Sequence, residues 1–164
     1  MTLAIVAVHG NGGGASRFDL VGPEIPGDVE FRAITLPGFS TVAKDPALRT
    51  LGDYADRLAE LFNDLDRPVL LGHGIGGSMA LDLASRRPEL LGGLVLHAPV
   101  GASLDTRLFP RVMTSRPVRG LVRRAISSRL PRPLMRRVFF PHGAPKATLD
   151  RFFDEYRHCA AFGD

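Results

Sequence analysis

The chain has 164 residues, of which 45% are hydrophobic and 23% charged, with a formal net charge of +4. This balance excludes a disordered chain and favours one folded domain, or one domain with a small appendage. The single cysteine, Cys159, excludes an internal disulfide, and no apolar run approaches the roughly 20 residues that a membrane-spanning helix needs. Because the first residues lack the pattern of a secretory signal peptide, we expect a cytoplasmic protein.

Strand and helix patterns alternate along the first hundred residues. The predicted strands are short apolar runs at residues 3–8, 31–36, 68–71 and 94–96. A capping-box pattern at residues 50–53 begins an amphipathic helix, and a second helix is predicted at residues 75–87. Strands this apolar are typical of a parallel sheet that is covered on both faces. The predicted fold class is therefore α/β, with a mostly parallel sheet flanked by helices.

The segment Leu-Leu-Gly-His-Gly-Ile-Gly-Gly-Ser at residues 70–78 has the layout of a nucleophile elbow. An elbow is a sharp turn from a strand into a helix, written G-x-S-x-G, and Gly72 and Gly76 occupy its outer glycine positions. The central residue is Gly74, which has no nucleophilic side chain. Glycine adopts positive φ without Cβ strain, so this residue relieves about 1–3 kcal/mol of strain and removes the attacking atom. We expect the turn to be kept and its nucleophilic chemistry to be lost.

Three turns, in this order along the chain, resemble the α/β-hydrolase superfamily. They are His-Gly-Asn-Gly at residues 9–12, Pro-Gly-Phe-Ser at 37–40 and the elbow at 72–77. The resemblance covers almost the whole chain and implies an oxyanion hole that is formed by the backbone N–H groups of Asn11 and Ile75. It also places three further residues at the ligand site: Gly10, Gly12 and His73.

The family's triad also needs an acid and a histidine that follow later strands, and the chain ends at Asp164 before such strands occur. We therefore expect part of a hydrolase whose ancestors cleaved an ester, thioester or related bond of a small apolar acyl or aryl substrate. As it stands, the chain is expected to be inactive or incomplete. The alternative is a non-catalytic protein that binds a ligand or a partner. We expect no cofactor and no metal.

The residues beyond Ser103 are far more basic than those before it, and this change coincides with a cluster of prolines. We therefore divide the chain into a partial hydrolase core, 1–103, and a basic helical cap, 104–164. In the family that the chain resembles, a cap closes over the active site. We expect an acyl, aryl or alkyl group to lie beneath four cap residues, although these side chains could instead pack against the core or each other. The four residues are Met135, Phe139, Phe152 and Phe153.

A dinucleotide-binding protein is the main competing class. The glycine spacings within residues 10–15 and 72–77 both fit the G-x-G-x-x-G/A fingerprint. That fingerprint also needs an acidic residue at the end of the next strand to bind the ribose. The next strands end in Thr-Leu-Pro at 35–37 and His-Ala-Pro at 97–99, without an acid. The nucleotide interpretation is therefore disfavoured.

The expected partner is a small-molecule substrate or ligand. Arginines in the basic third would attract phosphates, but they lack a recognised nucleic-acid module and interleaved aromatic residues, so we expect neither nucleic acid nor membrane as a partner. The strand that ends at His97 would expose an unpaired edge in a partial core. We therefore expect a homodimer, or a complementing C-terminal fragment, to bind through this edge.

Overall fold

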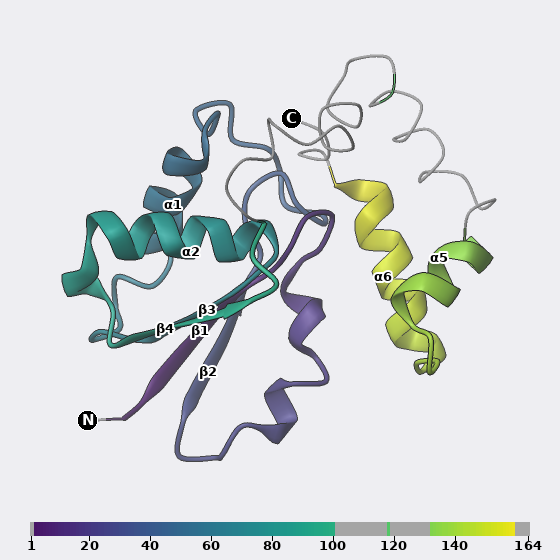
Figure 1. Cartoon of the computed structure of the whole chain (residues 1–164), viewed down its shortest axis with the longest axis horizontal. Helices are drawn as coiled ribbons and strands as arrows, with labels where there is room; N and C mark the ends of the chain where they lie inside the picture. Colours follow the sequence, from purple (N-terminus) through teal and green to yellow (C-terminus); the bar gives the residue numbers. More distant parts are fainter. Residues whose placement is uncertain (1, 101–117, 119–131, 160–164) are drawn as a thin grey trace.

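The computed structural model describes residues 2–100, 118 and 132–159, and Figure 1 shows their arrangement. The sheet consists of β1 (Ala4–Val8), β2 (Glu30–Ile34), β3 (Val69–His73) and β4 (Gly93–His97). These strands lie in the order β2-β1-β3-β4, and every neighbouring pair is parallel. The fold class is therefore confirmed as a parallel sheet with flanking helices.

Helices α1 (Leu51–Glu60) and α2 (Ile75–Arg86) follow β2 and β3 in the chain and pack together on one face of the sheet (Figure 1). Helix α1 begins with the capping box that the sequence predicted. The Thr50 hydroxyl accepts a hydrogen bond from the Asp53 N–H at 3.1 Å, and the Asp53 carboxylate accepts one from the Thr50 N–H at 2.8 Å. Two N–H groups at the start of the helix therefore have acceptors.

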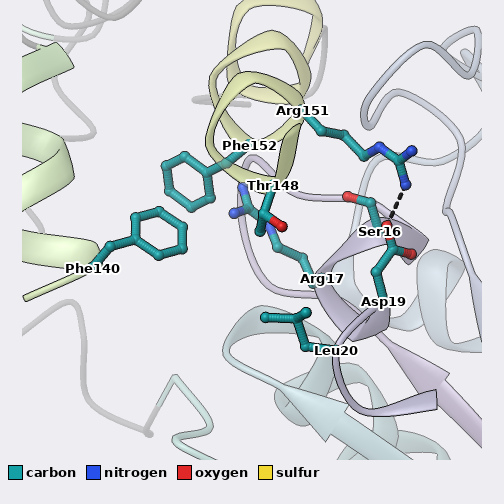
Figure 2. A pocket seen from close by; sticks show the side chains of 8 residues that line it. All are labelled: Ser16, Arg17, Asp19, Leu20, Phe140, Thr148, Arg151 and Phe152. Carbon is teal, nitrogen blue, oxygen red and sulfur yellow. Dashed lines mark hydrogen bonds and ion pairs between the residues drawn. The ribbon is translucent and has the colours of Figure 1, made fainter. Parts of the chain in front are cut away.

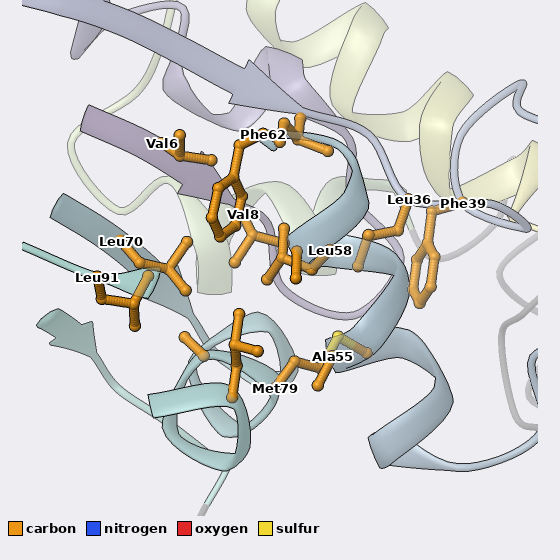
Figure 3. Packing of buried hydrophobic residues seen from close by; sticks show 14 of the residues in the cluster. Val6, Val8, Leu36, Phe39, Ala55, Leu58, Phe62, Leu70, Met79 and Leu91 are labelled. Carbon is orange, nitrogen blue, oxygen red and sulfur yellow. The ribbon is translucent and has the colours of Figure 1, made fainter. Parts of the chain in front are cut away.

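The hydrophobic core lies between the sheet and these two helices (Figure 3). Its most deeply buried side chains come from strands, loops and helices alike: Val6, Val8, Leu36, Leu58, Leu70 and Met79. Alternate strand residues point to the same face, so Val6 and Val8 both face α1 and α2. This packing fixes the carboxyl ends of β1 and β3 next to each other, where the candidate site lies.

The opposite face of the sheet is less covered than the sequence predicted. Ile5 and Leu71 are half-buried there, and Val95, the partner of Leu71 in β4, is 47% exposed. On the same face Ala7 is fully buried, and the short helix η1 (Ala15–Phe18) contacts β1 and β2. In the described part of the chain, the expectation that both faces are covered therefore holds at β1 and β2 and fails at β4. At the outer strand β4, Leu96 is also exposed.

Helices α5 (Arg132–Phe139) and α6 (Lys146–His158) lie apart from α1 and α2, on the other side of the molecule in Figure 1. Helix α6 contacts the short helix η1 (Ala15–Phe18), which follows β1. The predicted boundary between 1–103 and 104–164 lies outside the described residues, so this division stays a prediction. None of the helices in the described ranges is long and apolar enough to cross a membrane.

Candidate functional site

The turn from β3 into α2 has the backbone geometry of an elbow. Gly74 has φ 57° and ψ −122°, a conformation that residues with a Cβ rarely adopt. Its N–H donates to the His97 carbonyl at 3.0 Å, and its own carbonyl accepts from the N–H groups of Gly77 at 3.0 Å and Val100 at 3.1 Å. The turn is thus fixed between the ends of β3 and β4, and the predicted positive φ of Gly74 is confirmed.

The glycines around the elbow allow backbone segments to approach closely. A Cβ on Gly72 would lie 2.6 Å from the Gly77 Cα, and a Cβ on Gly76 would overlap the His9 carbonyl oxygen. A Cβ on Gly74, in contrast, would meet only the Gly10 Cα, at 3.3 Å. A Cβ at position 74 would therefore lie tightly against one backbone atom, whereas one at Gly72 or Gly76 would overlap the backbone.

His9 fixes the turn that follows β1. Its ring is fully buried, its Nε2 accepts from the Leu36 N–H at 3.1 Å, and its Nδ1 therefore carries the proton that it shares with the Gly10 carbonyl at 2.9 Å. Burial lowers the pKa of His9 to about 4, so the ring is neutral at pH 7. Within the turn, the Gly13 N–H donates to the Gly10 carbonyl at 3.2 Å. His9 thus joins the ends of β1 and β2, a role that the sequence reasoning missed.

The predicted oxyanion donors lie on these two neighbouring turns. Asn11 follows Gly10 and is exposed, and Ile75 is the first residue of α2, where helical N–H groups lack an intrahelical acceptor. Among the hydrogen bonds within the described residues, none uses either N–H group as a donor. Because Gly10 lies beside Gly74, both N–H groups belong to the same end of the sheet. Their assignment as oxyanion donors stays a prediction.

His73 lies against the same turn. A Cβ on Gly10 would come within 2.7 Å of the His73 Nδ1, so the imidazole occupies the space that the glycine leaves. The ring stacks on His97, with centroids 5.0 Å apart and planes at 25°. Burial lowers the pKa of His73, and the neighbouring His97 and Arg17 lower it further. These contacts indicate that His73 is a neutral imidazole packed at the rim of the candidate site.

Three of the four predicted cap residues meet in an aromatic cluster. Phe152 lies 5.3 Å from Phe139 and 5.4 Å from Phe153 between ring centroids, and both Phe152 and Phe153 are buried. Met135 is half-buried and Phe139 is 49% exposed. The contacts among the rings match the alternative in which these side chains pack against each other. A role as the lining of a ligand pocket stays a prediction.

Tyr156 and Arg17, which the sequence did not point to, lie against the turn that follows β1. A Cβ on Gly12 would overlap the Tyr156 ring, and the Arg17 guanidinium donates to the Gly12 carbonyl at 3.3 Å. A pocket of about 100 Å³ adjoins Arg17 (Figure 2). It is lined by Ser16, Arg17, Asp19, Leu20, Phe140, Thr148, Arg151 and Phe152. The described residues contain no group of three or more His, Cys, Asp or Glu side chains that could hold a metal.

Comparison with known proteins places the chain in a family. The sequence pattern of the "Alpha/beta hydrolase family" matches residues 5–164. A pimeloyl-[acyl-carrier protein] methyl ester esterase from Aromatoleum aromaticum is 30% identical over 155 residues, which are 94% of this chain and 50% of that protein. The chain thus spans about half the length of this curated relative.

Solved structures show the same fold. The N-acyl homoserine lactonase AidH, complexed with N-butanoyl homoserine, matches with a TM-score of 0.64 and 20% identity, over 99% of this chain and 62% of that one. An extracellular α/β-hydrolase from a Paenibacillus species matches with a TM-score of 0.66 and 19% identity, over 96% of this chain and 69% of that one. Together with the match over residues 5–164, these findings show that the chain belongs to the α/β-hydrolase family.

Proposed function

We propose that this chain binds the carbonyl group of a small apolar acyl or aryl ester, or thioester, at the elbow, and that it forms no acyl intermediate through position 74. The observation that carries the proposal is Gly74: it keeps the φ of an elbow residue, has no side chain where a nucleophile would stand, and lies beside the turn of Asn11. Two backbone N–H groups, those of Asn11 and Ile75, would bind the carbonyl oxygen.

Acyl transfer by this fold needs a nucleophile that is activated by a base. Ser78, the nearest hydroxyl along α2, donates to the Val100 carbonyl at 2.7 Å and is thereby engaged with the backbone. His73 is packed against Gly10 and His97 rather than beside a hydroxyl. These contacts support binding rather than covalent catalysis by the described residues.

The names of the relatives support the substrate class. One relative is an esterase of a pimeloyl-[acyl-carrier protein] methyl ester, and AidH is a lactonase of N-acyl homoserine lactones. A serine-to-glycine variant of AidH has been crystallised with N-hexanoyl homoserine lactone. We extend the shared chemistry, a carbonyl that carries an apolar acyl chain, to this chain.

Two matched ligands test the proposal: p-nitrophenyl butyrate, and p-nitrophenyl butyl ether, in which a methylene replaces the carbonyl. We expect both to bind saturably by ligand-observed NMR, the ester more tightly by roughly five- to a hundredfold, the net value of two hydrogen bonds. No p-nitrophenolate should be released above the buffer rate. Turnover of the ester that follows the protein concentration would overturn the proposal.

Ile75→Pro removes one predicted donor, because proline has no N–H and is well tolerated at the first position of a helix. The preference for the ester over the ether should then fall by roughly two- to tenfold, because the Asn11 N–H still binds the carbonyl. Ile75→Ala is the matched control, since it shortens the same side chain, keeps the N–H and should keep the preference. An equal loss in both variants would mean that the side chain, not the N–H, contributes to binding.

No second strand of the described residues pairs with β4 beside β3, and this edge favours a second proposal, that a further β-strand from a complementing fragment pairs with β4. Val95 and Leu96 are 47% and 37% exposed there, and the curated relative extends well beyond the part that this chain matches. An unpaired strand edge with apolar side chains is prone to association. Size-exclusion chromatography tests this: a stable monomer whose β4 amides exchange slowly with solvent would contradict it.

A further inference from the structure

Three consecutive glycines at residues 12–14 lie against α6 rather than against the elbow. A Cβ on the first would overlap the Tyr156 ring, one on the second would lie 2.6 Å from Arg17 Nε, and one on the third would lie 2.8 Å from Glu155 Oε1. Tyr156 and Glu155 belong to α6, and Arg17 is held by that helix. The glycine run therefore makes room for side chains that dock α6 on the turn.

Glu155 is the charged centre of this contact. Its side chain is almost fully buried, its Oε1 accepts from the Ser16 hydroxyl at 2.5 Å, and its Oε2 lies 3.7 Å from Arg17 Nε. A buried carboxylate needs a cation or hydrogen-bond donors close by. Here both come from η1, so the charge on α6 is stable only while η1 stays in place.

Arg17 connects α6 with the turn that follows β1. Its guanidinium donates to the Gly12 carbonyl at 3.3 Å and lies 3.7 Å from the centroid of the Phe152 ring, also on α6. Figure 2 shows the Arg17 side chain reaching from η1 towards Phe152 and Thr148. Burial lowers the pKa of Arg17, and Tyr156 and Glu155 oppose that shift. The residue that it holds, Gly12, directly follows the predicted oxyanion donor Asn11.

We propose that Glu155, acting through Ser16 and Arg17, is a positioning residue. It fixes the orientation of the Asn11 N–H, which would bind the carbonyl of the ligand. Helix α6 would then control the candidate site through the backbone of the first turn, without touching the ligand's carbonyl. This inference rests on the proposed function, because the carbonyl is the group that the Asn11 N–H would bind.

Glu155→Gln tests the role, because it keeps the size of the side chain and removes the charge that faces Arg17. We expect the preference for p-nitrophenyl butyrate over p-nitrophenyl butyl ether to fall by roughly two- to tenfold, with binding of the ether unchanged. Asp154→Asn is the matched control: it changes an exposed carboxylate on the same helix, which interacts with His158, and should leave the preference intact. A purely structural role of Glu155 would weaken both ligands equally and would overturn the inference.

Hydrogen exchange of the Gly13 amide gives a readout that does not depend on ligand binding. This N–H donates to the Gly10 carbonyl inside the turn, and Glu155→Gln should speed its exchange about tenfold relative to the Leu70 amide in the sheet. If the wild-type chain does not prefer the ester, the proposed function fails, and Gly13 exchange alone decides whether Glu155 positions the turn. If the preference is present but Glu155→Gln alters neither it nor Gly13 exchange, only the positioning role fails.

Ser16→Ala covers the case in which Glu155→Gln does not fold. It removes the hydroxyl that donates to Glu155 and leaves the charge pair with Arg17 in place. Ser16→Ala should also lower the preference for the ester and speed exchange of the Gly13 amide, and both effects should be smaller than in Glu155→Gln. A folded Ser16→Ala variant with unchanged ester preference and unchanged Gly13 exchange would overturn the inference.

Discussion

The glycines of the elbow are packed by backbone atoms, whereas those of the first turn, residues 12–14, are packed by side chains. A Cβ on Gly72 would meet the Cα of Gly77, and one on Gly76 would meet the carbonyls of His9 and Val8. The neighbours of the first turn are the side chains of Tyr156, Arg17 and Glu155. The sheet fixes the positions of these backbone neighbours, so the conformation of the elbow is determined by the fold. The shape of the first turn depends in addition on where α6 lies.

The largest expected effect comes from Gly76→Ala. The new Cβ would overlap the carbonyl oxygen of His9 and lie 2.8 Å from that of Val8, and neither can move without disturbing β1. We expect the free energy of unfolding to fall by about 3 kcal/mol or more, the upper end for an overpacked core. Urea denaturation measures this loss.

Gly27→Ala is the control for that variant, because a Cβ at Gly27 would meet no atom within 4 Å. It should change the free energy of unfolding by no more than about 0.5 kcal/mol. A similar, small cost in both variants would show that the elbow is not packed as tightly as the comparison of the two turns requires.

The hydrogen bond from the Leu36 N–H to His9, which joins the turn after β1 to the end of β2, should make the free energy of unfolding depend on pH. Burial holds the pKa of His9 near 4 in the folded chain, against an ordinary value of 6.5. Between these values the unfolded chain binds more protons than the folded one, so the stability is full above pH 6.5 and is lost as the pH falls towards 4. This shift corresponds to about 3 kcal/mol at most.

Urea denaturation at pH 7 and pH 4.5 measures this loss, and His9→Asn isolates it from the titration of carboxylates. The asparagine has no titrating ring, so the variant should lose less stability than the wild type over the same pH range. Parallel pH profiles of the two proteins would mean that His9 is not held neutral by burial.

Gly74→Ser should affect stability less than Gly76→Ala, although both lie in the elbow. A Cβ at 74 meets only the Gly10 Cα, at 3.3 Å, so the main cost is the positive φ, about 1–3 kcal/mol. We also expect no release of p-nitrophenolate from p-nitrophenyl butyrate, because the serine alone would lack a base and an acid. Robust turnover by Gly74→Ser would show that a base is already in place.

Much of the fold could be predicted from local patterns. Apolar runs that end in glycine or proline placed the four strands, and the capping box placed the start of α1 at Thr50. The third strand was predicted at residues 68–71 but runs from Val69 to His73, because Gly72 and His73 still pair with β4. Glycine in the sequence suggested a turn, and the pairing partner that extends the strand is not visible in the local pattern.

The candidate site was predictable only where a motif carries its geometry within a few residues. The elbow met this condition, and Gly74 has the φ that its place in the motif predicted. The contact of Tyr156 with Gly12 joins residues at opposite ends of the chain, and neither residue has a local pattern that points to the other. His9 gave a weak signal, a polar residue directly after an apolar strand, but its partner Leu36 lies on another strand end.

The smallest expected effect, from Gly13→Ala, tests the first turn itself. The new Cβ would lie 2.6 Å from Arg17 Nε, so this side chain must shift within its contacts to Glu155 and Phe152. A side chain shifts at lower cost than the backbone atoms around Gly76, so we expect a loss of about 1 kcal/mol. In an Arg17→Ala background the obstacle is absent, and Gly13→Ala should then cost less than in the wild type. The coupling between the two substitutions, measured by urea denaturation of all four proteins, should be at least about 0.5 kcal/mol. Additive losses would mean that the turn excludes a side chain at 13 for reasons within its own backbone, and the contrast with the elbow would disappear.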